Sequence, residues 1–505
     1  MKKFIALSAA AAMAATIGSA SEADLKAELE ALKKEVAALK KQTKGLDSKK
    51  LKKQISQLKG AAFNDNIKWS VDFRTAYDVI GYKDINGNSS WNQIFSNRLW
   101  LGMGYAPTNN VVFKGLLSYY KAYGQMTNTF GADFNYFDWV VNETPNPNGE
   151  LRVKEAYWLY FGDSFLGADI PWTASLGRRP ATDGLLASYR EDQNPKSPLG
   201  HIINTEFDGA SFKFDLSNVT GISGMYFKLC MGRGMTNASV RYAGITPGFV
   251  YGTSSQLVVS GNGTDYNKVP GYEATDLAGF IFVPYDDGQY SVHTTAFQAW
   301  NLPGIVFNSQ APDVDTNGDG INDSFSGNFQ QVGDLYGAAI SLLAQGVGDG
   351  ISDMLDETNL FLSFAASQTD PSDGNRMLGS TDKKTGTSIY LGANWPCQLI
   401  DDARIGVEYN HGSQYWRSFT YAEDTLAGSK LATRGDAFEV WLNKELVGKT
   451  LTAQIRYTYM DYKYTGSNGF FADGGTPVEV DSVYGRMMGA IDKAQDIRMY
   501  IRYRY

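Results

Sequence analysis

Cysteine and histidine are scarce in this chain of 505 residues, which contains two cysteines and three histidines. Cys230 and Cys397 can form at most one bridge, so a scaffold held together by disulfides is excluded. With only His201, His293 and His411, a catalytic or metal site built on several histidines is not expected, and no cofactor is required. The formal net charge of −8 argues against nucleic acid as a partner.

Long apolar runs are also missing beyond the N-terminal segment. After residue 23, no uninterrupted apolar stretch approaches the roughly 20 residues that a membrane-spanning helix needs. Glycine and aromatic residues are plentiful instead, with 53 glycines, 30 tyrosines and 27 phenylalanines. The aromatic content excludes a disordered chain, and the combination with glycine favours an all-β protein.

The first 23 residues have the pattern of a secretory signal peptide. Two lysines precede a small, alanine-rich apolar run, and Ala20 and Ala23 both suit cleavage. We therefore expect the mature chain to be exported, without an apolar helix that crosses a membrane. A soluble secreted protein and an outer-membrane β-barrel both remain open at this point.

Residues 24–60 carry apolar side chains at the alternating spacing of four and three that is typical of a coiled coil. Such a seam is buried only against other helices, so this segment predicts an oligomerising stalk. It holds 11 lysines against 5 acidic residues, whereas the remainder is acidic, which predicts a domain boundary near residue 60 and a second domain over 61–505. The basic residues form either a contact with anionic cell wall or a solvated face. The seam residues are Leu25, Leu29, Leu32, Val36, Leu39 and Leu46.

The end of the chain alternates strictly between apolar and largely polar residues. One face carries Ile497, Met499, Ile501, Tyr503 and Tyr505, and the other carries Asp496, Arg498, Tyr500, Arg502 and Arg504. Residues 67–74 repeat this alternation, which is the pattern of a strand with one apolar face. In a membrane barrel, the apolar face would contact lipid and the charged face would line a wet lumen.

Similar segments between these two ends bring the predicted number of strands to sixteen, with boundaries good to about 2–4 residues. They lie near 92–106, 110–124, 151–163, 170–178, 204–216, 222–232, 276–285, 289–302, 332–345, 358–368, 386–395, 403–412, 435–444 and 449–463. Short and long connections alternate, as in barrels with short periplasmic turns and long external loops. The long ones lie near 125–150, 179–203, 233–275, 301–331, 413–434 and 464–493. Aromatic residues near strand ends suit interfacial girdles, namely Trp69, Tyr105, Trp300, Trp395 and Tyr462.

These features resemble Gram-negative outer-membrane porins. The aromatic end of the last strand, with Ile501, Tyr503 and Tyr505, resembles the signal that the barrel-assembly machinery recognises. The coiled-coil start and the stretch Ser-Leu-Gly-Arg-Arg-Pro-Ala-Thr-Asp-Gly at 175–184 resemble a poorly characterised family of porin-like proteins. The resemblance implies an antiparallel transmembrane β-barrel of about 16 strands (range about 14–18) and a homotrimer in outer-membrane lipid. It also implies a periplasmic stalk, extracellular long loops, and passive diffusion of small hydrophilic solutes or ions. The long, irregular loops depart from a general-diffusion porin and admit a more selective pore.

A barrel of roughly 16–18 strands encloses an aqueous channel, so its selectivity depends on charged rings and on loops folded inside. The third long loop, 179–203, is the predicted constriction, with its acids facing arginines of the wall. The alternative is that these charges belong to surface loops and to salt bridges that brace the barrel, and the preference for anions or cations stays open. The candidate residues are Arg98, Arg178, Arg179, Asp183, Arg190, Glu191, Asp192, Arg498, Arg502 and Arg504.

One acidic, glycine-rich stretch resembles a calcium loop of thrombospondin-type repeats. It places side-chain oxygens on alternate residues, and calcium takes 6–8 oxygen ligands. The predicted ligands at this extracellular loop are Asp313, Asp315, Asn317, Asp319 and Asp323. The alternative is an acidic surface turn that binds no metal.

Enzymatic activity is not expected. His411 lies two residues before Ser413, as a nucleophile pair would, but the sequence shows no partner to activate it. The main alternative to a porin is a non-channel outer-membrane protein, in which loops plug the barrel while the stalk and external loops tether or bind. A secreted β-sandwich is the third possibility.

Overall fold

The computed structural model describes most of the chain after residue 66, and residues Asn66–Tyr505 form one compact unit. The described ranges are 67–125, 138–146, 149–180, 189–190, 198–237, 273–316, 318–348, 350–420 and 423–505. The predicted signal peptide (1–23), the predicted stalk (24–60) and the boundary near residue 60 lie outside them. None of the helices in these ranges is both long and apolar enough to cross a membrane.

The described residues form an antiparallel sheet of sixteen strands, and each predicted segment overlaps one of them. The strands are β1 (Lys68–Asp84), β2 (Ser89–Thr108), β3 (Val111–Ala122), β4 (Arg152–Gly162), β5 (Trp172–Pro180), β6 (Glu206–Asp215), β7 (Tyr226–Met235), β8 (Thr275–Asp286), β9 (Tyr290–Phe307), β10 (Gly327–Gln345), β11 (Asn359–Pro371), β12 (Thr385–Pro396), β13 (Ala403–Gly412), β14 (Gly435–Val447), β15 (Leu451–Tyr462) and β16 (Ile491–Arg504). The described parts of the connections contain five short helices, namely η2 (Pro198–His201), α4 (Ser217–Thr220), α5 (Asp353–Asp356), η3 (Asp473–Gly475) and α6 (Val483–Met487).

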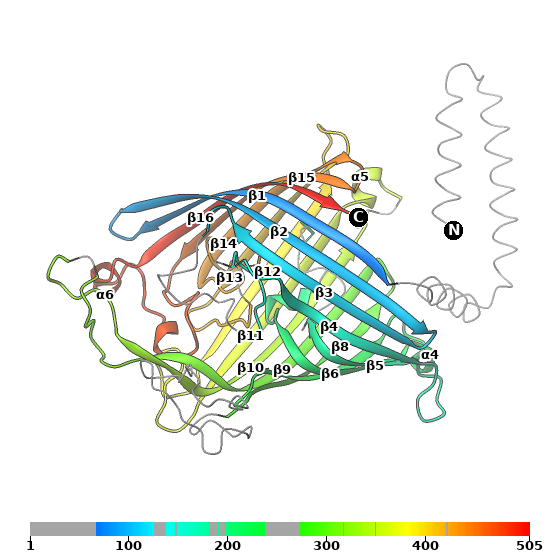
Figure 1. The fold of residues 1–505 in the computed structure, drawn as a ribbon, viewed down its shortest axis with the longest axis horizontal. Helices are drawn as coiled ribbons and strands as arrows, with labels where there is room; N and C mark the ends of the chain where they lie inside the picture. Colours follow the sequence, from blue (N-terminus) through cyan, green and yellow to red (C-terminus); the bar gives the residue numbers. More distant parts are fainter. Residues whose placement is uncertain are drawn as a thin grey trace, which may run out of the picture. The chain divides into compact units, whose positions relative to one another are not determined.

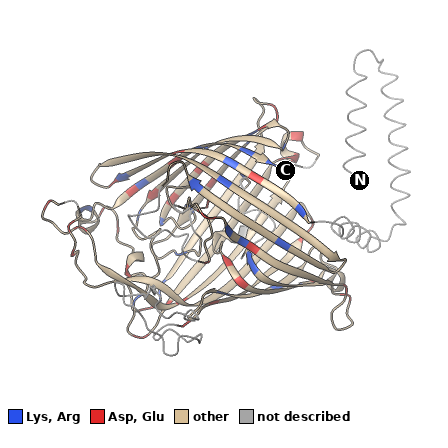
Figure 2. Cartoon of the chain, in the orientation of Figure 1, with Lys and Arg blue, Asp and Glu red and all other residues tan. Residues whose placement is uncertain are grey.

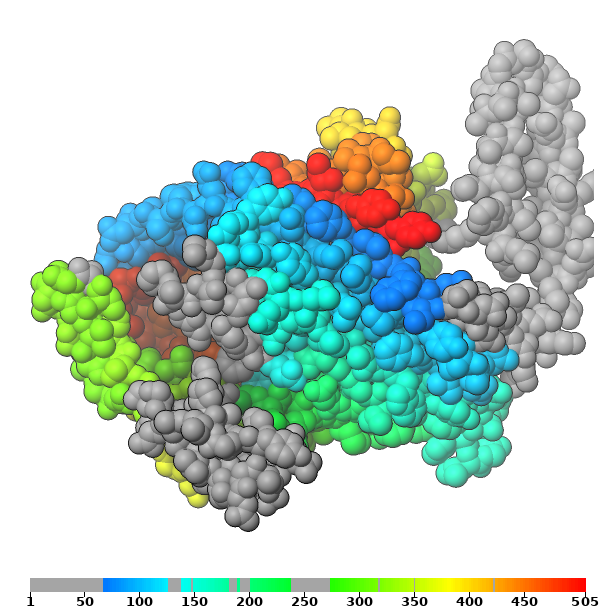
Figure 3. Space-filling view, viewed as in Figure 1, coloured from blue at the N-terminus to red at the C-terminus, as the bar shows by residue number. Residues whose placement is uncertain are grey.

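The sheet closes into a barrel in which every strand pairs with its neighbours in the sequence and β1 also pairs with β16 (Figure 1). The closing register runs from Asp72 opposite Arg504 to Asp84 opposite Ile491. Colours follow this order around the wall of the space-filling view (Figure 3). Closure pairs the backbone amides that the first and last strands would otherwise leave exposed. The predicted all-β barrel of about 16 strands is therefore confirmed.

Side chains alternate between the two faces of the wall as the sequence predicts. On β16, Met499 and Ile501 are 45% and 53% exposed, whereas Arg498 and Arg502 are 0% and 2% exposed. On β1, Phe73 faces outward and Arg74 is fully buried. Because successive side chains of a strand point to opposite faces, the outer surface is apolar and the interior is rich in charge.

Two strand pairs are longer than the sequence suggested. β1 and β2 continue until a tight hairpin turn at 85–88 joins them, and Gly87 in this turn has a φ of +95°. The polar residues between the two predicted strands therefore form strand ends and a turn rather than a long loop. β9 and β10 extend into the predicted loop 301–331. The ladder continues past register shifts on both sides of Gly333, and Pro303 and Gly304 pair with residues of β10. Polar, glycine and proline residues interrupt the apolar–polar alternation in both extensions, so the sequence pattern did not predict them.

The connections at one end of the barrel are short, and those at the other end are mostly long. Figure 1 shows α4 and α5 at the short-turn end and α6 at the opposite end. The long connections do not all stay outside the barrel. Residues from four of them, Trp139, Ile202, Phe419 and Phe471, share one buried apolar cluster with inward residues of the strands.

The connection 413–434 is the most deeply buried of these segments. Its described residues Trp416, Ser418 and Thr433 have no exposed surface, and Arg417, Thr425 and Ala432 are 1% exposed. This connection therefore folds into the barrel and fills part of its interior. It also corrects one assignment of the aromatic girdle, because Tyr462 is 7% exposed and packs in a cluster with Ala427 of this connection rather than outward.

Candidate functional site

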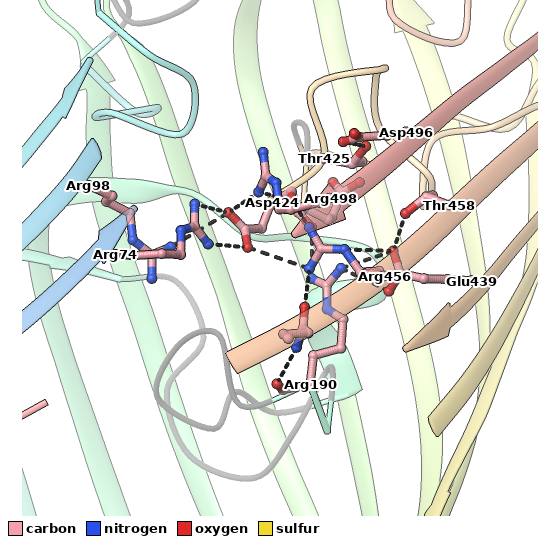
Figure 4. Close-up of polar contacts among 12 residues, drawn as sticks. Arg74, Arg98, Arg190, Asp424, Thr425, Glu439, Arg456, Thr458, Asp496 and Arg498 are labelled. Atoms are coloured by element: carbon pink, nitrogen blue, oxygen red, sulfur yellow. Dashed lines mark hydrogen bonds and ion pairs between the residues drawn. The ribbon is translucent and has the colours of Figure 1, made fainter. Parts of the chain in front are cut away.

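The carboxylate of Asp424, in the connection 413–434, lies among arginines that project from the barrel wall (Figure 4). Arg74 of β1 donates two hydrogen bonds to it, of 2.6 and 2.8 Å. Arg498 of β16 approaches it to 2.9 Å, and Arg98 of β2 and Arg456 of β15 each approach it to 3.6 Å. We call Arg74, Arg98, Arg456 and Arg498 the arginine cluster.

The arginine cluster comes from four strands that are adjacent in the closed barrel. Arg74 lies directly opposite Arg98 in the ladder between β1 and β2, and Arg456 lies directly opposite Arg498 between β15 and β16. Like charges that face each other across a ladder destabilise the sheet. A negative group must therefore offset them, and Asp424 occupies that position.

Aromatic side chains of the wall hold the guanidinium groups in place. The guanidinium carbon of Arg98 lies 3.7 Å from the ring centroid of Trp100, whose indole N–H donates to Ser118 over 2.9 Å. Arg74 lies between the rings of Tyr120 and Tyr500, at 5.7 and 5.4 Å. These cation–π contacts position the arginines from the wall itself, independently of Asp424.

A second centre forms around Glu439 of β14. Its carboxylate accepts hydrogen bonds of 2.8 and 3.0 Å from Arg190 of the connection 179–203. Lys430 donates to it over 2.8 Å, Thr458 donates over 2.7 Å, and Arg456 lies 3.8 Å away. Glu439 thus links the connections 179–203 and 413–434 to the barrel wall.

Further hydrogen bonds hold the connection 413–434 inside the barrel. Asp496 of β16 accepts from the hydroxyl of Thr425 over 2.9 Å and from the backbone N–H of Leu426 over 3.0 Å. Arg417 donates to the carbonyl of Ser467 over 2.7 Å. Arg434 donates to the carbonyl of Gly475 over 2.6 Å, so the last long connection braces the same segment.

The electrostatics of Asp424 follow from these contacts. Burial by itself would raise the pKa of its carboxyl group, but Arg74, Arg498, Arg98 and Arg456 hold that pKa well below its usual range. The four arginines therefore favour the ionised form of Asp424. Figure 2 shows the distribution of charge over the strands: basic residues (blue) and acidic residues (red) form separate short segments among residues of other types (tan).

The structure brings three of the predicted constriction residues together, namely Arg98, Arg190 and Arg498. Arg502, two inner-face positions beyond Arg498 on β16, pairs with Asp72 at 2.8 Å, and Arg504 lies at the end of that strand. Arg178 pairs with Asp138 at 2.8 Å and Asp208 at 3.5 Å, and Arg179 donates to the hydroxyls of Ser175 and Ser211, so both lie apart from the cluster. Asp183, Glu191 and Asp192 lie outside the described residues.

Loop and wall charges pair in both directions. Acids of the connection 179–203 were expected to face arginines of the wall, and this stays a prediction because those acids lie outside the described residues. The described Arg190 of this connection faces a wall acid, Glu439. The acid that faces wall arginines is Asp424, which belongs to the connection 413–434. The sequence pattern could place Arg74 on the inner face of a strand, but nothing in it pointed to Asp424, because the contact spans 350 positions.

The histidines have structural partners among the described residues. Nδ1 of His411 lies 2.9 Å from Asp436, while the hydroxyl of Ser413 accepts from the N–H of Thr387. His293 lies 3.0 Å from the hydroxyl of Ser291. Cys230 and Cys397 form no disulfide bridge with each other.

The predicted calcium loop is a turn of the connection between β9 and β10. Asp315 accepts from the N–H groups of Gly318 and Gly320, Asp313 accepts from Ser326, and Asp323 accepts from Thr316. Asp319 accepts from Ile321, and Asn317 is outside the described residues. Within the described ranges, no group of three His, Cys, Asp or Glu residues is arranged to hold a metal ion. Calcium binding remains a prediction.

His201 is the most deeply buried histidine and belongs to the connection 179–203. Its ring nitrogens lie 3.0 Å from the hydroxyl of Ser363 and 2.8 Å from that of Ser388, on the inner faces of β11 and β12. Burial lowers the pKa of His201 to about 3, against the effect of Asn410. The ring is therefore neutral in the folded protein.

Comparisons with known proteins give one family and a set of distant structures. The profile of a family described as "Protein of unknown function (DUF3373)" matches residues 88–505. None of the curated proteins compared with this sequence matches it. The solved structures that it resembles over most of its length are outer-membrane porins, three of which follow.

An anion-selective porin from Comamonas acidovorans is 11% identical, with a TM-score of 0.44 over 87% of this chain and 100% of the other. OprB from Pseudomonas putida is 14% identical, with a TM-score of 0.44 over 87% and 94%. OmpT, an outer membrane protein of Vibrio cholerae, is 11% identical, with a TM-score of 0.41 over 87% and 97%.

The substitution Glu439→Gln should reduce the free energy of unfolding by about 3–5 kcal/mol, because it leaves buried cations without their carboxylate. Urea unfolding of the refolded protein in detergent measures this. The control is Asp276→Asn, because Asp276 pairs with Arg233 at a site where the two side chains are 41% and 50% exposed. This variant should lower the free energy of unfolding by less than about 1 kcal/mol. Equal costs for the two variants would contradict the buried network.

His201 should make the folded state less stable as the pH falls. The unfolded histidine has a pKa near 6.5 and the folded one about 3, so the unfolded chain binds more protons between these values. Stability is therefore complete above pH 6.5, and about 2 kcal/mol is lost between pH 7 and pH 5. His201→Gln should remove this loss in urea titrations at the two pH values, and His411→Gln should retain it. The same pH dependence in wild type and His201→Gln would refute the assignment.

Proposed function

Because the chain belongs to the family described as protein of unknown function (DUF3373), its role has to come from its own residues, and we propose an outer-membrane porin. It passes small hydrophilic solutes or ions by passive diffusion through the barrel. It is a channel rather than an enzyme.

The observation that carries this proposal is the closed barrel with an apolar outer face and a charged inner face. A barrel in a membrane satisfies its backbone amides internally and presents apolar side chains to lipid. Exposed outward residues such as Ile455, Val440 and Phe438 are suited to contact with lipid. In water, such an apolar surface would cause the barrels to aggregate. A barrel of this strand number has room for an aqueous path.

The narrowest part of the path is the region of Asp424 and Glu439. The connection 413–434 supplies most of the restriction, and Arg190 of the connection 179–203 adds to it. Both connections reach wall residues through buried ion pairs rather than lying over the mouth. Solutes therefore pass a charged, narrow zone, which favours a selective pore over general diffusion.

The remaining features complete the proposal. The signal peptide directs export, and Ile501, Tyr503 and Tyr505 at the end of β16 serve the barrel-assembly machinery. The short turns face the periplasm, the long connections face outward, and the stalk 24–60 supports a homotrimer and contacts the cell wall. Arg502 and Arg504 continue the charged face toward the periplasmic mouth.

A second candidate function follows from the burial of the connection 413–434. If that segment never leaves the barrel, the protein is a plugged outer-membrane barrel that acts in tethering or surface binding. Conductance distinguishes the two functions, because a plugged barrel is silent although it is folded and inserted.

The outer face is tested by Ile455→Arg, near the middle of β15. A lipid-facing arginine at mid-depth should reduce the free energy of unfolding in lipid vesicles by about 2–4 kcal/mol. Urea titration followed by tryptophan fluorescence measures the change. Val219→Arg is the control, because Val219 is 50% exposed in the turn helix α4 and should cost less than about 1 kcal/mol. A tolerated arginine at 455 would refute the lipid-facing assignment.

The channel is tested by replacing residues 416–432 with a short Gly/Ser turn. Gly412 and Gly435 are cross-strand partners, so a short turn can join β13 to β14. Single-channel conductance in a planar bilayer should rise several-fold over wild type, because the restricting segment is gone. The control shortens residues 309–325, whose flanking Phe307 and Gly327 are likewise partners, and should leave conductance unchanged.

Three results would contradict the proposal or its constriction. Unchanged conductance after replacing residues 416–432 would show that this segment does not restrict the pore. An equal rise after shortening residues 309–325 would show that the effect is not specific. Silence from the wild type, once folding and insertion are demonstrated, together with conductance after replacement of residues 416–432, would favour the plugged barrel, and silence from all of these proteins would reject the channel.

A further inference from the structure

We propose that His201 is a proton-sensitive latch, which holds the connections 179–203 and 413–434 inside the barrel at neutral pH and releases both when its ring is protonated. The inference deepens the proposed function, because it names the signal that regulates the same constriction, and its consequence for conductance rests on that function. It is carried by a directed chain of hydrogen bonds, by the burial of the ring and by backbone hydrogen bonds between the two connections.

The ring of His201 belongs to a chain of hydrogen bonds that runs in one direction. The amide nitrogen of Asn410 donates to the carbonyl of Lys430 over 3.1 Å, so its amide oxygen accepts from the hydroxyl of Ser388, over 3.0 Å. That hydroxyl has a single proton, so Nε2 of His201 donates to its oxygen, over 2.8 Å. The neutral ring therefore carries its proton on Nε2.

The other ring nitrogen, Nδ1, is an acceptor in the same chain. The hydroxyl of Ser341 donates to the hydroxyl oxygen of Ser363 over 2.7 Å, and that oxygen lies 3.0 Å from Nδ1 of His201. Because Nδ1 has no proton in this tautomer, Ser363 donates to it. A second proton on the ring would make Nδ1 a donor that faces another donor, which breaks the chain.

The surroundings of the ring offer nothing that would stabilise its charged form. Among the described residues, no carboxylate contacts His201, and the inner faces of β10 and β11 carry no titratable side chain. His293 of β9 contacts a serine of its own strand. Tyr390 of β12 lies 5.4 Å from the ring of His201, between centroids, and donates its hydroxyl to Glu408 of β13 over 2.7 Å. Glu408 is itself paired with Lys430 of the connection 413–434.

The latch lies beside the contact that joins the two connections. The backbone N–H of Phe419 donates to the carbonyl of Ile202 over 2.7 Å, and the N–H of Asn204 donates to the carbonyl of Phe419 over 3.0 Å. The rings of His201 and Trp416 are 5.4 Å apart, between centroids. The side chain that β11 and β12 bind therefore holds two connected segments, so its release would free both of them from this part of the wall.

The direction of the pH effect follows from the two protonation equilibria. Burial lowers the pKa of the latched His201 to about 3, whereas a released ring has the ordinary value near 6.5. As the pH falls below 6.5, the released ring binds a proton while the latched ring stays neutral. The ratio of released to latched molecules should therefore rise about 25-fold between pH 7 and pH 5.

Cysteine accessibility tests this without requiring conduction. The background is the full chain with Cys230→Ala and Cys397→Ala, folded in detergent. Ser418→Cys then places a thiol of similar size at a position of the connection 413–434 that has no exposed surface. Its rate of labelling by a methanethiosulfonate reagent is divided by that of Leu166→Cys, which stands at a 92% exposed position, so that the ionisation of the thiol cancels.

This relative labelling rate should rise about 25-fold from pH 7 to pH 5 when His201 is present. It should stay constant when His201→Gln is added. The amide of glutamine can donate to Ser388 and accept from Ser363, but it does not titrate. The two proteins therefore differ in the proton and not in the chain of hydrogen bonds.

Ile203→Cys is the second probe, at a 5% exposed position beside the latch, and it should show the same rise. Ser96→Cys is the matched control, because Ser96 is 1% exposed on the inner face of β2, and it should show none. A constant rate at both probes, or the same rise with His201→Gln, would overturn the proposal. A rise at one probe only would overturn the joint release. An equal rise at Ser96→Cys would assign the effect to unfolding of the wall and would also overturn the proposal.

Bilayer recordings separate this inference from the proposed function. The wild type should open to a larger conductance more often at pH 5 than at pH 7, and His201→Gln should not. Labelling that depends on His201, without conductance by any of these proteins, would reject the channel and retain the latch. Discrete conductance together with labelling that does not depend on His201 would retain the channel and reject the latch.

Discussion

The hydrogen-bonded ladder between β1 and β16 joins the first strand of the barrel to the last. It runs from Asp72 opposite Arg504 to Asp84 opposite Ile491, and without it two rows of backbone amides would be exposed. Closure also places the inner faces of β15, β16, β1 and β2 side by side. The arginine cluster exists only because this ladder brings Arg74 and Arg98 beside Arg456 and Arg498.

Closure of the barrel brings several arginine side chains together in the interior, and their positive charge has to be compensated. Facing arginines repel each other, and the buried segment 413–434 supplies the compensating carboxylate of Asp424. The same segment carries Lys430 to Glu439, so opposite charges hold it at two points. Charge compensation therefore explains why a connection without regular secondary structure is among the most deeply buried parts of the chain.

Much of the fold could be predicted from the sequence, because strand alternation is a local property. The outward positions of Met499 and Ile501 and the inward positions of Arg498 and Arg502 follow from a period of two and need no knowledge of the partner strands. The extension of β9 past Pro303 could not be predicted in this way, since a register shift against β10 accommodates it. The site was only partly predictable. Arg98, Arg190 and Arg498 were named, but Arg74, Arg456, Asp424 and Glu439 were missed.

The sequence by itself determined the strand count, the two faces of the wall and some of the inward arginines, such as Arg98 and Arg498. Each of these depends on residues within one strand or on neighbouring strands. Only the tertiary structure decided which loop enters the barrel and which acid meets the arginines. Asp424 and Arg74 are 350 positions apart, and their contact depends on closure and on the path of a segment with no periodic pattern. The period of two predicts the face of a strand to which each side chain points, whereas a salt bridge depends on where distant segments of the chain meet.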